Sequence, residues 1–260
     1  MPKTSGTNYN PASVAITGGT ISNVTLGGST NAEVIVAKWA IPFVVAPTGT
    51  MANNGAITLG TALDTTYSDG IWLYLPAGAV AAGVPAAAGW LWCVMSSSTV
   101  GAVYNSTYTS GTPTAGTTTA FSTTGPGAYT GVTTQISGPT ITIPGGTFGA
   151  NGQLRIVNHL AATNNADTKI IGVVYNATDF DTNTFASVAL GRHETFIMNR
   201  GATGNQEGYT QQFASGSIVT SAFTAGAVDS TASQTLTIKY TRGTATDKLT
   251  HMSGAIYAIQ

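Results

Sequence analysis

Charge is scarce in this 260-residue sequence. Nine Lys and Arg residues and ten Asp and Glu residues make up 7% of the chain and leave a net charge of −1, whereas charged residues make up roughly a quarter of an ordinary soluble protein. No basic patch indicates nucleic-acid binding, and no basic amphipathic segment indicates a membrane-surface helix. A surface of Thr, Ser, Asn and Gly produces little repulsion between copies, which favours a protein that packs against itself.

Cysteine is nearly absent too. The single Cys93 excludes an intrachain disulfide framework, and its place in the apolar run 89–95 predicts a small buried hydrophobic residue. The first ten residues have no apolar core, so we expect no signal peptide. The uncharged run 71–95 is long enough to span a bilayer, but prolines and glycines interrupt it. We interpret it as two strands, 71–75 and 90–95, joined by a loop.

The sequence also lacks the signatures of catalysis. It has no GxSxG or HExxH spacing and no Gly-rich phosphate loop. The densest ionisable cluster is Arg192, His193 and Glu194, which we interpret as a local salt bridge at the start of a strand, because no nucleophile signature accompanies it. His159 and His251 stand alone and predict no zinc site. We therefore predict no enzymatic activity, no cofactor, and no catalytic, cofactor-binding or metal-binding residue.

One segment approaches a calcium loop. Asp179, Asp181 and Asn183 have the 1-3-5 spacing of an EF-hand, but Thr184 stands where Gly is needed and Leu190 where Glu is needed. Because both discriminating positions fail, a polar turn between strands is the favoured interpretation, with a looser metal site as the alternative.

The four tryptophans have two interpretations. Trp39, Trp72, Trp90 and Trp92 all lie on or beside expected strands. They could form a stacking platform for a host glycan, but such residues are more often core or interface anchors. We favour anchors.

Short alternating apolar runs are abundant. Apolar residues recur at a period of two, which is strand spacing, and no window carries the i, i+3, i+4, i+7 stripe of a helix. The expected strands are 39–45, 56–60, 71–75, 90–95, 100–106, 136–146, 153–158, 168–176, 185–190, 194–201, 208–214, 217–223, 234–241 and 252–259. The prediction is an all-β chain with a short N-terminal β-repeat in 1–36, a β-rich region with a long Thr- and Gly-rich loop in 37–138, and a jelly-roll-like antiparallel β-sandwich in 139–260.

The N-terminal repeat lies in residues 14–30, VAITGGTISNVTLGGST, whose two halves echo each other around Gly-Gly pairs. Two short strands cannot bury their apolar faces alone. Three copies around an axis would bury them together, and a hairpin docked on its own domain is the alternative. The candidate trimer and anchor residues are Val14, Ile16, Ile21, Val24 and Leu26.

Several segments resemble surface proteins of tailed-bacteriophage particles. Residues 14–30 resemble the Gly-Gly-Thr repeats that open many phage fibre proteins. Further similar segments are IPFVVAPTGTMANNGAITLGTAL (41–63), TTGPGAYTG (123–131), ITIPGGTFGANGQLRI (141–156) and NRGATGNQ (199–206). The resemblance implies a homotrimer on the virion surface, made in the host cytoplasm and contacting other virion proteins such as the major capsid or tail proteins.

Two functions follow from the resemblance. The first is a capsid decoration protein or head fibre, anchored through the N-terminal segment. The second is a tail-fibre tip that recognises a host surface glycan or protein. The short N-terminal region favours the first, because a tail fibre usually needs a longer stalk.

Overall fold

The computed structural model describes residues 33–39, 42–52, 55–76, 89–107, 127–180, 184, 186, 189–214, 217–220 and 223–259. Contacts divide the chain into two compact units, Met1–Ala32 and Glu33–Gln260, and the described residues all belong to the second. The first strand begins at Glu33, inside the segment 1–36 of the sequence prediction. The candidate trimer residues Val14, Ile16, Ile21, Val24 and Leu26 lie outside the described residues.

The described part of the chain consists of strands and connecting segments, with no helix, so the all-β prediction is confirmed. A 14-stranded sheet contains most of the strands, and a separate four-stranded sheet has the order β12-β11-β17-β9. The large sheet contains β1 (Glu33–Trp39), β2 (Phe43–Val45), β3 (Gly49–Met51), β4 (Ala56–Leu59), β5 (Ile71–Leu75), β6 (Gly89–Met95), β7 (Val100–Thr107), β8 (Gly127–Tyr129), β10 (Gln153–Ala162), β13 (Leu190–Asn199), β14 (Gln206–Ala214), β15 (Ser217–Thr220), β16 (Thr224–Gly226) and β18 (Leu249–Ile259). The small sheet contains β9 (Ile136–Ile143), β11 (Lys169–Tyr175), β12 (Thr178–Asp179) and β17 (Gln234–Arg242).

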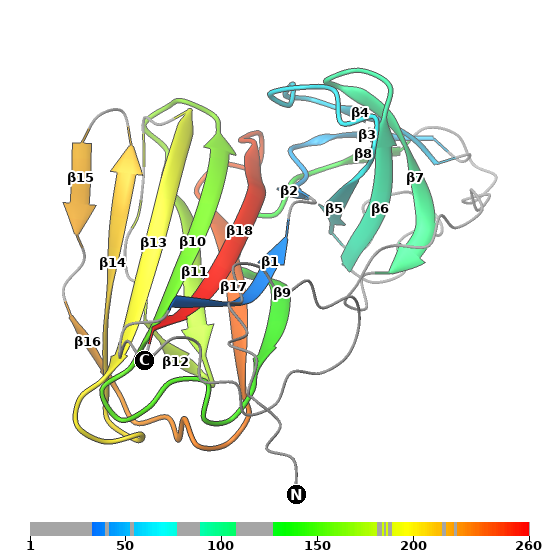
Figure 1. Ribbon diagram of the computed structural model, residues 1–260. Coiled ribbons are helices and arrows are strands. Elements are labelled where there is room, and N and C mark those ends of the chain that lie inside the picture. Colours follow the sequence, from blue (N-terminus) through cyan, green and yellow to red (C-terminus); the bar gives the residue numbers. More distant parts are fainter. Residues whose placement is uncertain are drawn as a thin grey trace, which may run out of the picture. The chain divides into compact units, whose positions relative to one another are not determined.

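Strand β18 joins the parts of the large sheet. It pairs along its length with β10, and its other edge is shared by β1 and β2 (Figure 1). Sequence alternation predicts one strand over 39–45, but only Phe43–Val45 of it forms β2, and Trp39 is the last residue of β1, whose residues 33–38 were not predicted as a strand. Pro42 lies between the two strands. Proline has no N–H for a strand ladder. The Pro42 carbonyl instead accepts a hydrogen bond from the backbone N–H of Trp72 at 2.9 Å.

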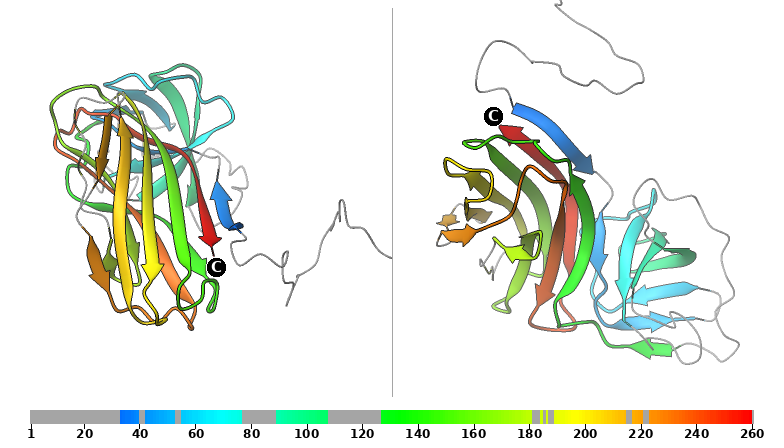
Figure 2. Two further views of the ribbon diagram at one scale, coloured as in Figure 1. Left: turned by 60° about the vertical axis from the view of Figure 1, so that its left-hand side comes forward. Right: turned by 90° about the horizontal axis from the view of Figure 1, so that it is seen from below.

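Two sheets pack face to face to form the main core. Alternation turns Leu154 and Ile156 of β10 toward Ile171 of β11 and Ile238 of β17, and all four side chains belong to one buried cluster. In Figure 1, β11 and β17 of the small sheet lie behind β10, β13 and β18, and Figure 2 shows the same strands from two further sides. Burial of each such side chain contributes about 1.5–3 kcal/mol, which is why the period-two pattern selects this layered arrangement.

A second buried cluster lies among β2 to β8. It includes Ile71, Leu73, Leu91 and Cys93, which come from the antiparallel pair β5 and β6. The uncharged run 71–95 therefore forms two strands, as predicted, and residues 77–88 between them lie outside the described residues. Within the described part of the chain, no helix has the length and apolar character to cross a membrane.

The predicted strand 185–190 needs correction, and one pair of strands departs from the predicted antiparallel arrangement. Residues 184, 186 and 189 are not in a strand, and β13 begins only at Leu190, whose side chain is 60% exposed. The run 185–190 alternates in sequence, but the Leu190 side chain is exposed to solvent, so the alternation does not mark a buried face here. The ladders in the described residues are antiparallel except for that between β2 and β5, which is parallel.

Candidate functional site

A row of large side chains crosses one face of the large sheet. This is the face turned away from the small sheet, and we call it the outer face. Residues directly opposite each other in neighbouring strands point to the same face, and the strand register makes each member of the row the partner of the next. Phe223 extends the row. Thr224 of β16 pairs with Gly208 of β14, so the preceding Phe223 lies opposite Tyr209. We call this set the outer row: Ile35, Tyr257, Arg155, Phe196, Tyr209 and Phe223.

The rings of the outer row contact one another. Phe196 and Tyr209 stack with centroids 4.9 Å apart and planes 15° apart, and Tyr209 meets Phe223 at 5.1 Å. The Arg155 guanidinium lies over the Tyr257 ring, 5.6 Å from its centroid. Aromatic and cation–π contacts of this kind orient side chains on a sheet surface, so the outer row is an ordered feature.

The outer face carries exposed large hydrophobic side chains. Four large hydrophobic side chains of the described residues are markedly exposed, and three of them are Ile35 (57%), Leu190 (60%) and Phe223 (60%). Leu190 shares the outer face with Arg192 by strand alternation. The fourth, Val100, belongs to β7. Ile35 and Phe223 lie at the two ends of the outer row, and the half-buried rings of Tyr257, Phe196 and Tyr209 lie between them. The apolar surface is continuous through these rings, and a continuous apolar patch marks an interaction surface, whereas scattered exposed residues do not.

Two arginines neutralise the one acidic residue at the centre of this face. Arg155 donates from Nε and Nη2 to the Glu194 carboxylate at 3.3 Å each, and Arg192 forms a second ion pair with Glu194. The Glu194 side chain is only 5% exposed. Arg192 in turn lies over the Phe213 ring, 5.5 Å from its centroid. Charge on the outer face is therefore paired locally.

The predicted cluster at 192–194 is divided by strand alternation. Arg192 and Glu194 form the expected salt bridge on the outer face, but His193 points to the inner face, where it is 1% exposed. There it lies opposite Asn158 of β10 and Gln212 of β14. His193 and Glu194 therefore cannot act on one substrate from one side of the sheet.

The other two histidines are also separated by the sheet. His159 is exposed and lies 3.3 Å from the Ser253 hydroxyl. His251 is buried, with its Nδ1 2.7 Å from the Tyr240 hydroxyl, and Trp39 Nε1 donates to its Nε2 at 3.3 Å. Burial, reinforced by the nearby charge of His193, lowers the pKa of His251 to about 3. Among the described residues, no three His, Cys, Asp or Glu side chains meet in a metal-binding arrangement.

Asp179 lies in β12, where its carboxylate forms an ion pair with Lys239. The Lys239 side chain is 8% exposed and that of Asp179 is 46% exposed. Asp181 and Asn183 lie outside the described residues, so the favoured polar turn and the alternative of a looser metal site are tested only at Asp179. At this position the Asp179 carboxylate forms an ion pair with Lys239.

The tryptophans are core residues, and the glycan-platform alternative is wrong for three of the four. Trp72, Trp90 and Trp92 are 2%, 9% and 8% exposed, and Trp72 and Trp92 meet edge to face at 5.3 Å. Trp39 is partly buried and packs against the same core. Cys93 is fully buried, and burial raises its thiol pKa to about 12, which keeps the thiol protonated as predicted for an inert residue.

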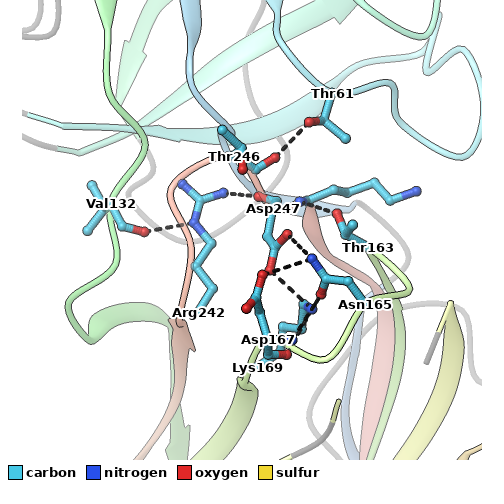
Figure 3. Close-up of polar contacts among 10 residues, drawn as sticks. Thr61, Val132, Thr163, Asn165, Asp167, Lys169, Arg242, Thr246 and Asp247 are labelled. Atoms are coloured by element: carbon cyan, nitrogen blue, oxygen red, sulfur yellow. Dashed lines mark hydrogen bonds and ion pairs between the residues drawn. The ribbon is translucent and has the colours of Figure 1, made fainter. Parts of the chain in front are cut away.

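A buried arginine ties the strands around β2 to the two-sheet core. Arg242, at the end of β17, is 1% exposed. Its Nε donates to the Val132 carbonyl at 2.7 Å and its Nη1 to the Val45 carbonyl at 3.0 Å, and the guanidinium also donates to the carbonyls of Ala46 and Asp247 (Figure 3). Burial lowers the pKa of Arg242 to about 10, although Asp247 acts to raise it. The cation therefore stays charged at neutral pH.

Asp247 continues this network into a second buried charge pair. Its Oδ2 lies 3.1 Å from Lys169 Nζ, and both side chains are at most 2% exposed. Asn165 Nδ2 donates to Asp247 Oδ1 at 2.8 Å and to Asp167 Oδ2 at 2.9 Å, as Figure 3 shows. A buried pair is tolerated when further hydrogen bonds satisfy it. This network is structural, because its polar atoms are directed at one another.

Neither a model of a protein family nor a curated protein matches the chain. Sequence reasoning did not find the outer row, since its members are spread from position 35 to position 257. Strand alternation at 153–158 and 194–201 is a partial signal, because it separates the inward set from the outward set. The exposed aromatic residues within the outward set could have indicated a contact surface.

Proposed function

We propose that the chain is a structural protein of a tailed-phage particle, a homotrimeric capsid decoration protein or head fibre that projects from the virion surface. The observation that carries this proposal is the outer row, an ordered apolar and aromatic surface on an all-β unit whose charges are few and paired. Interaction surfaces are enriched in Tyr, Phe and Arg and depleted in Lys and Asp, which matches the outer row.

Two further features support a structural role. Residues 1–32 precede the described unit, and they carry the fibre-like repeat in 14–30, which suits an anchor. In addition, the buried Arg242 and Lys169 bind across distant strands, which suits a rigid part of a particle. The jelly-roll topology and the trimer are part of this proposal.

The alternative function is a tail-fibre tip that recognises a host surface glycan or protein. The outer row bears on this choice, because Phe196 and Tyr209 each cover one ring face of the other and Phe223 packs against Tyr209, which leaves less free ring face for stacking on a sugar. We therefore place decoration of the capsid before glycan recognition.

Immunogold electron microscopy tests the proposed function. Antibodies raised against the purified chain are applied to particles from the phage that encodes it, with particles of an unrelated phage as the control. Label over the capsid surface is the expected result. Label confined to the tail tip would contradict capsid decoration and support the receptor-binding function. Purified particles without label would refute a virion role.

A further inference from the structure

We propose that the outer row is a contact surface for a second copy of this chain. This inference rests on the proposed function and deepens it by naming the surface and the partner. The starting point is that three of the four strongly exposed large hydrophobic side chains of the described residues lie on the outer face. Because the chain has so few charges, little electrostatic repulsion opposes contact between such faces of two copies.

The chemistry of the outer row fits a protein surface better than a sugar. Phe196 and Tyr209 are stacked face to face, and Arg155 covers the face of Tyr257. These contacts cover part of the ring faces, and Ile35 and Phe223 are the most exposed members of the row. Edges and aliphatic groups pack into the irregular surface of another protein, where rigid aromatic residues contribute most of the binding energy.

The charges of the outer face fit an identical partner. Arg155 and Arg192 both pair with Glu194, and Arg200 pairs with Glu207. After this pairing the face carries little net charge, so two copies meet without strong repulsion and without needing a partner of opposite sign. A strongly acidic or basic partner would gain little from this surface.

The size of the face is that of a small interface. The outer row runs from β1 to the start of β16 over six neighbouring strands, whose five spacings give about 24 Å, and the outward residues of β10 extend the face by about 20 Å along the strands. The flat outline is therefore roughly 480 Å², which lies at the low end of the size range of specific interfaces, below the roughly 800 Å² that each partner contributes to a standard one.

Two exposed members of the outer row provide the test. Ile35→Asp and Phe223→Asp each place a charge on the face, and exposures of 57% and 60% mean that the fold does not depend on either side chain. Val100→Asp is the matched control, because Val100 is 41% exposed and lies in β7. The full chain and the three variants are compared by sedimentation velocity over a range of concentrations, and their melting temperatures establish that each is folded.

We expect the unmodified chain and Val100→Asp to sediment as the same oligomer, and both outer-row variants to dissociate with at least about tenfold weaker association. A monomeric unmodified chain overturns the proposal. So does an oligomer that both folded outer-row variants retain. Loss of binding on a glycan array in both variants, with unchanged mass, would also overturn it in favour of a sugar ligand.

Failure of this contact can be distinguished from failure of the proposed function. If the variants retain the oligomer but antibody labels the capsid, the virion role stands and the outer row is not the contact. If the variants dissociate but particles carry no label, the contact between copies stands and the virion role fails.

Discussion

Replacement of Arg242 by methionine tests how the described unit is held together. Methionine preserves the aliphatic stem of the side chain but removes the guanidinium, which donates to four backbone carbonyls from β2, from the segment after β8 and from the turn before β18. Hydrogen bonds to a charged group contribute about 1.5–3 kcal/mol each, and a buried acceptor left unpaired costs about 1–3 kcal/mol. Removal of the buried charge recovers part of its desolvation cost.

The net loss of unfolding free energy should therefore be about 3–5 kcal/mol. For a unit of this size each kcal/mol lowers the melting temperature by about 2–4 °C, so Arg242→Met should melt roughly 6–20 °C below the unmodified chain. Thermal unfolding followed by circular dichroism at neutral pH measures this difference.

Arg200→Met is the matched control for Arg242→Met. The Arg200 side chain is 62% exposed and pairs with Glu207 at the surface, where an ion pair contributes about 0–1 kcal/mol. If Arg242→Met melts within a few degrees of the unmodified chain, or no lower than Arg200→Met, the guanidinium is not what joins these strands.

Three further predictions follow from buried or paired groups. Because the pKa of His251 falls from 6.5 to about 3 on folding, the unfolded state binds a proton between these values that the folded state does not. Stability should then decrease by about 1.4 kcal/mol per pH unit below 6.5, and urea unfolding at several pH values should show a shallower slope for His251→Gln. Cys93, with its thiol pKa raised to about 12, should react with iodoacetamide at pH 8 only after denaturation, and rapid native labelling would contradict its burial. Asp179→Asn should lower the free energy of unfolding, measured in urea, by about 1–2 kcal/mol, because it removes the carboxylate paired with the nearly buried Lys239. A chelator should leave the melting temperature of the unmodified chain unchanged. A large decrease of the melting temperature on chelation, restored by calcium, would instead indicate a structural ion.

Much of the strand content could be predicted, because alternation is a local property. In β10 the apolar Leu154 and Ile156 alternate with Gln153 and Arg155, and the pattern itself separates the inner from the outer face. Residues 33–38 of β1 were not predicted as a strand, and the break between Trp39 and β2 was missed although Pro42 is visible in the sequence. Their common pairing with β18 is a contact across more than 200 residues, which no local pattern contains.

The candidate site was less predictable, since it depends on register. Ile35 and Tyr257 become neighbours only when β1 pairs with β18, and Arg155 meets Phe196 only through the pairing of β10 with β13. The salt bridge predicted in the 192–194 cluster forms between Arg192 and Glu194, but alternation places His193 on the opposite face from both. The tryptophans were correctly favoured as anchors, because large aromatic residues in strands are usually buried.

Absolute quantification of this chain in purified particles tests the central claim most directly. Isotope-labelled peptides from residues 153–162 and 234–242, measured against peptides of the major capsid protein, give the number of copies per particle by mass spectrometry. A decoration protein or head fibre should be present in many copies, in a multiple of three, and in a fixed ratio to the capsid protein. A chain that is absent from purified particles, or present only in traces that vary between preparations, would contradict the account.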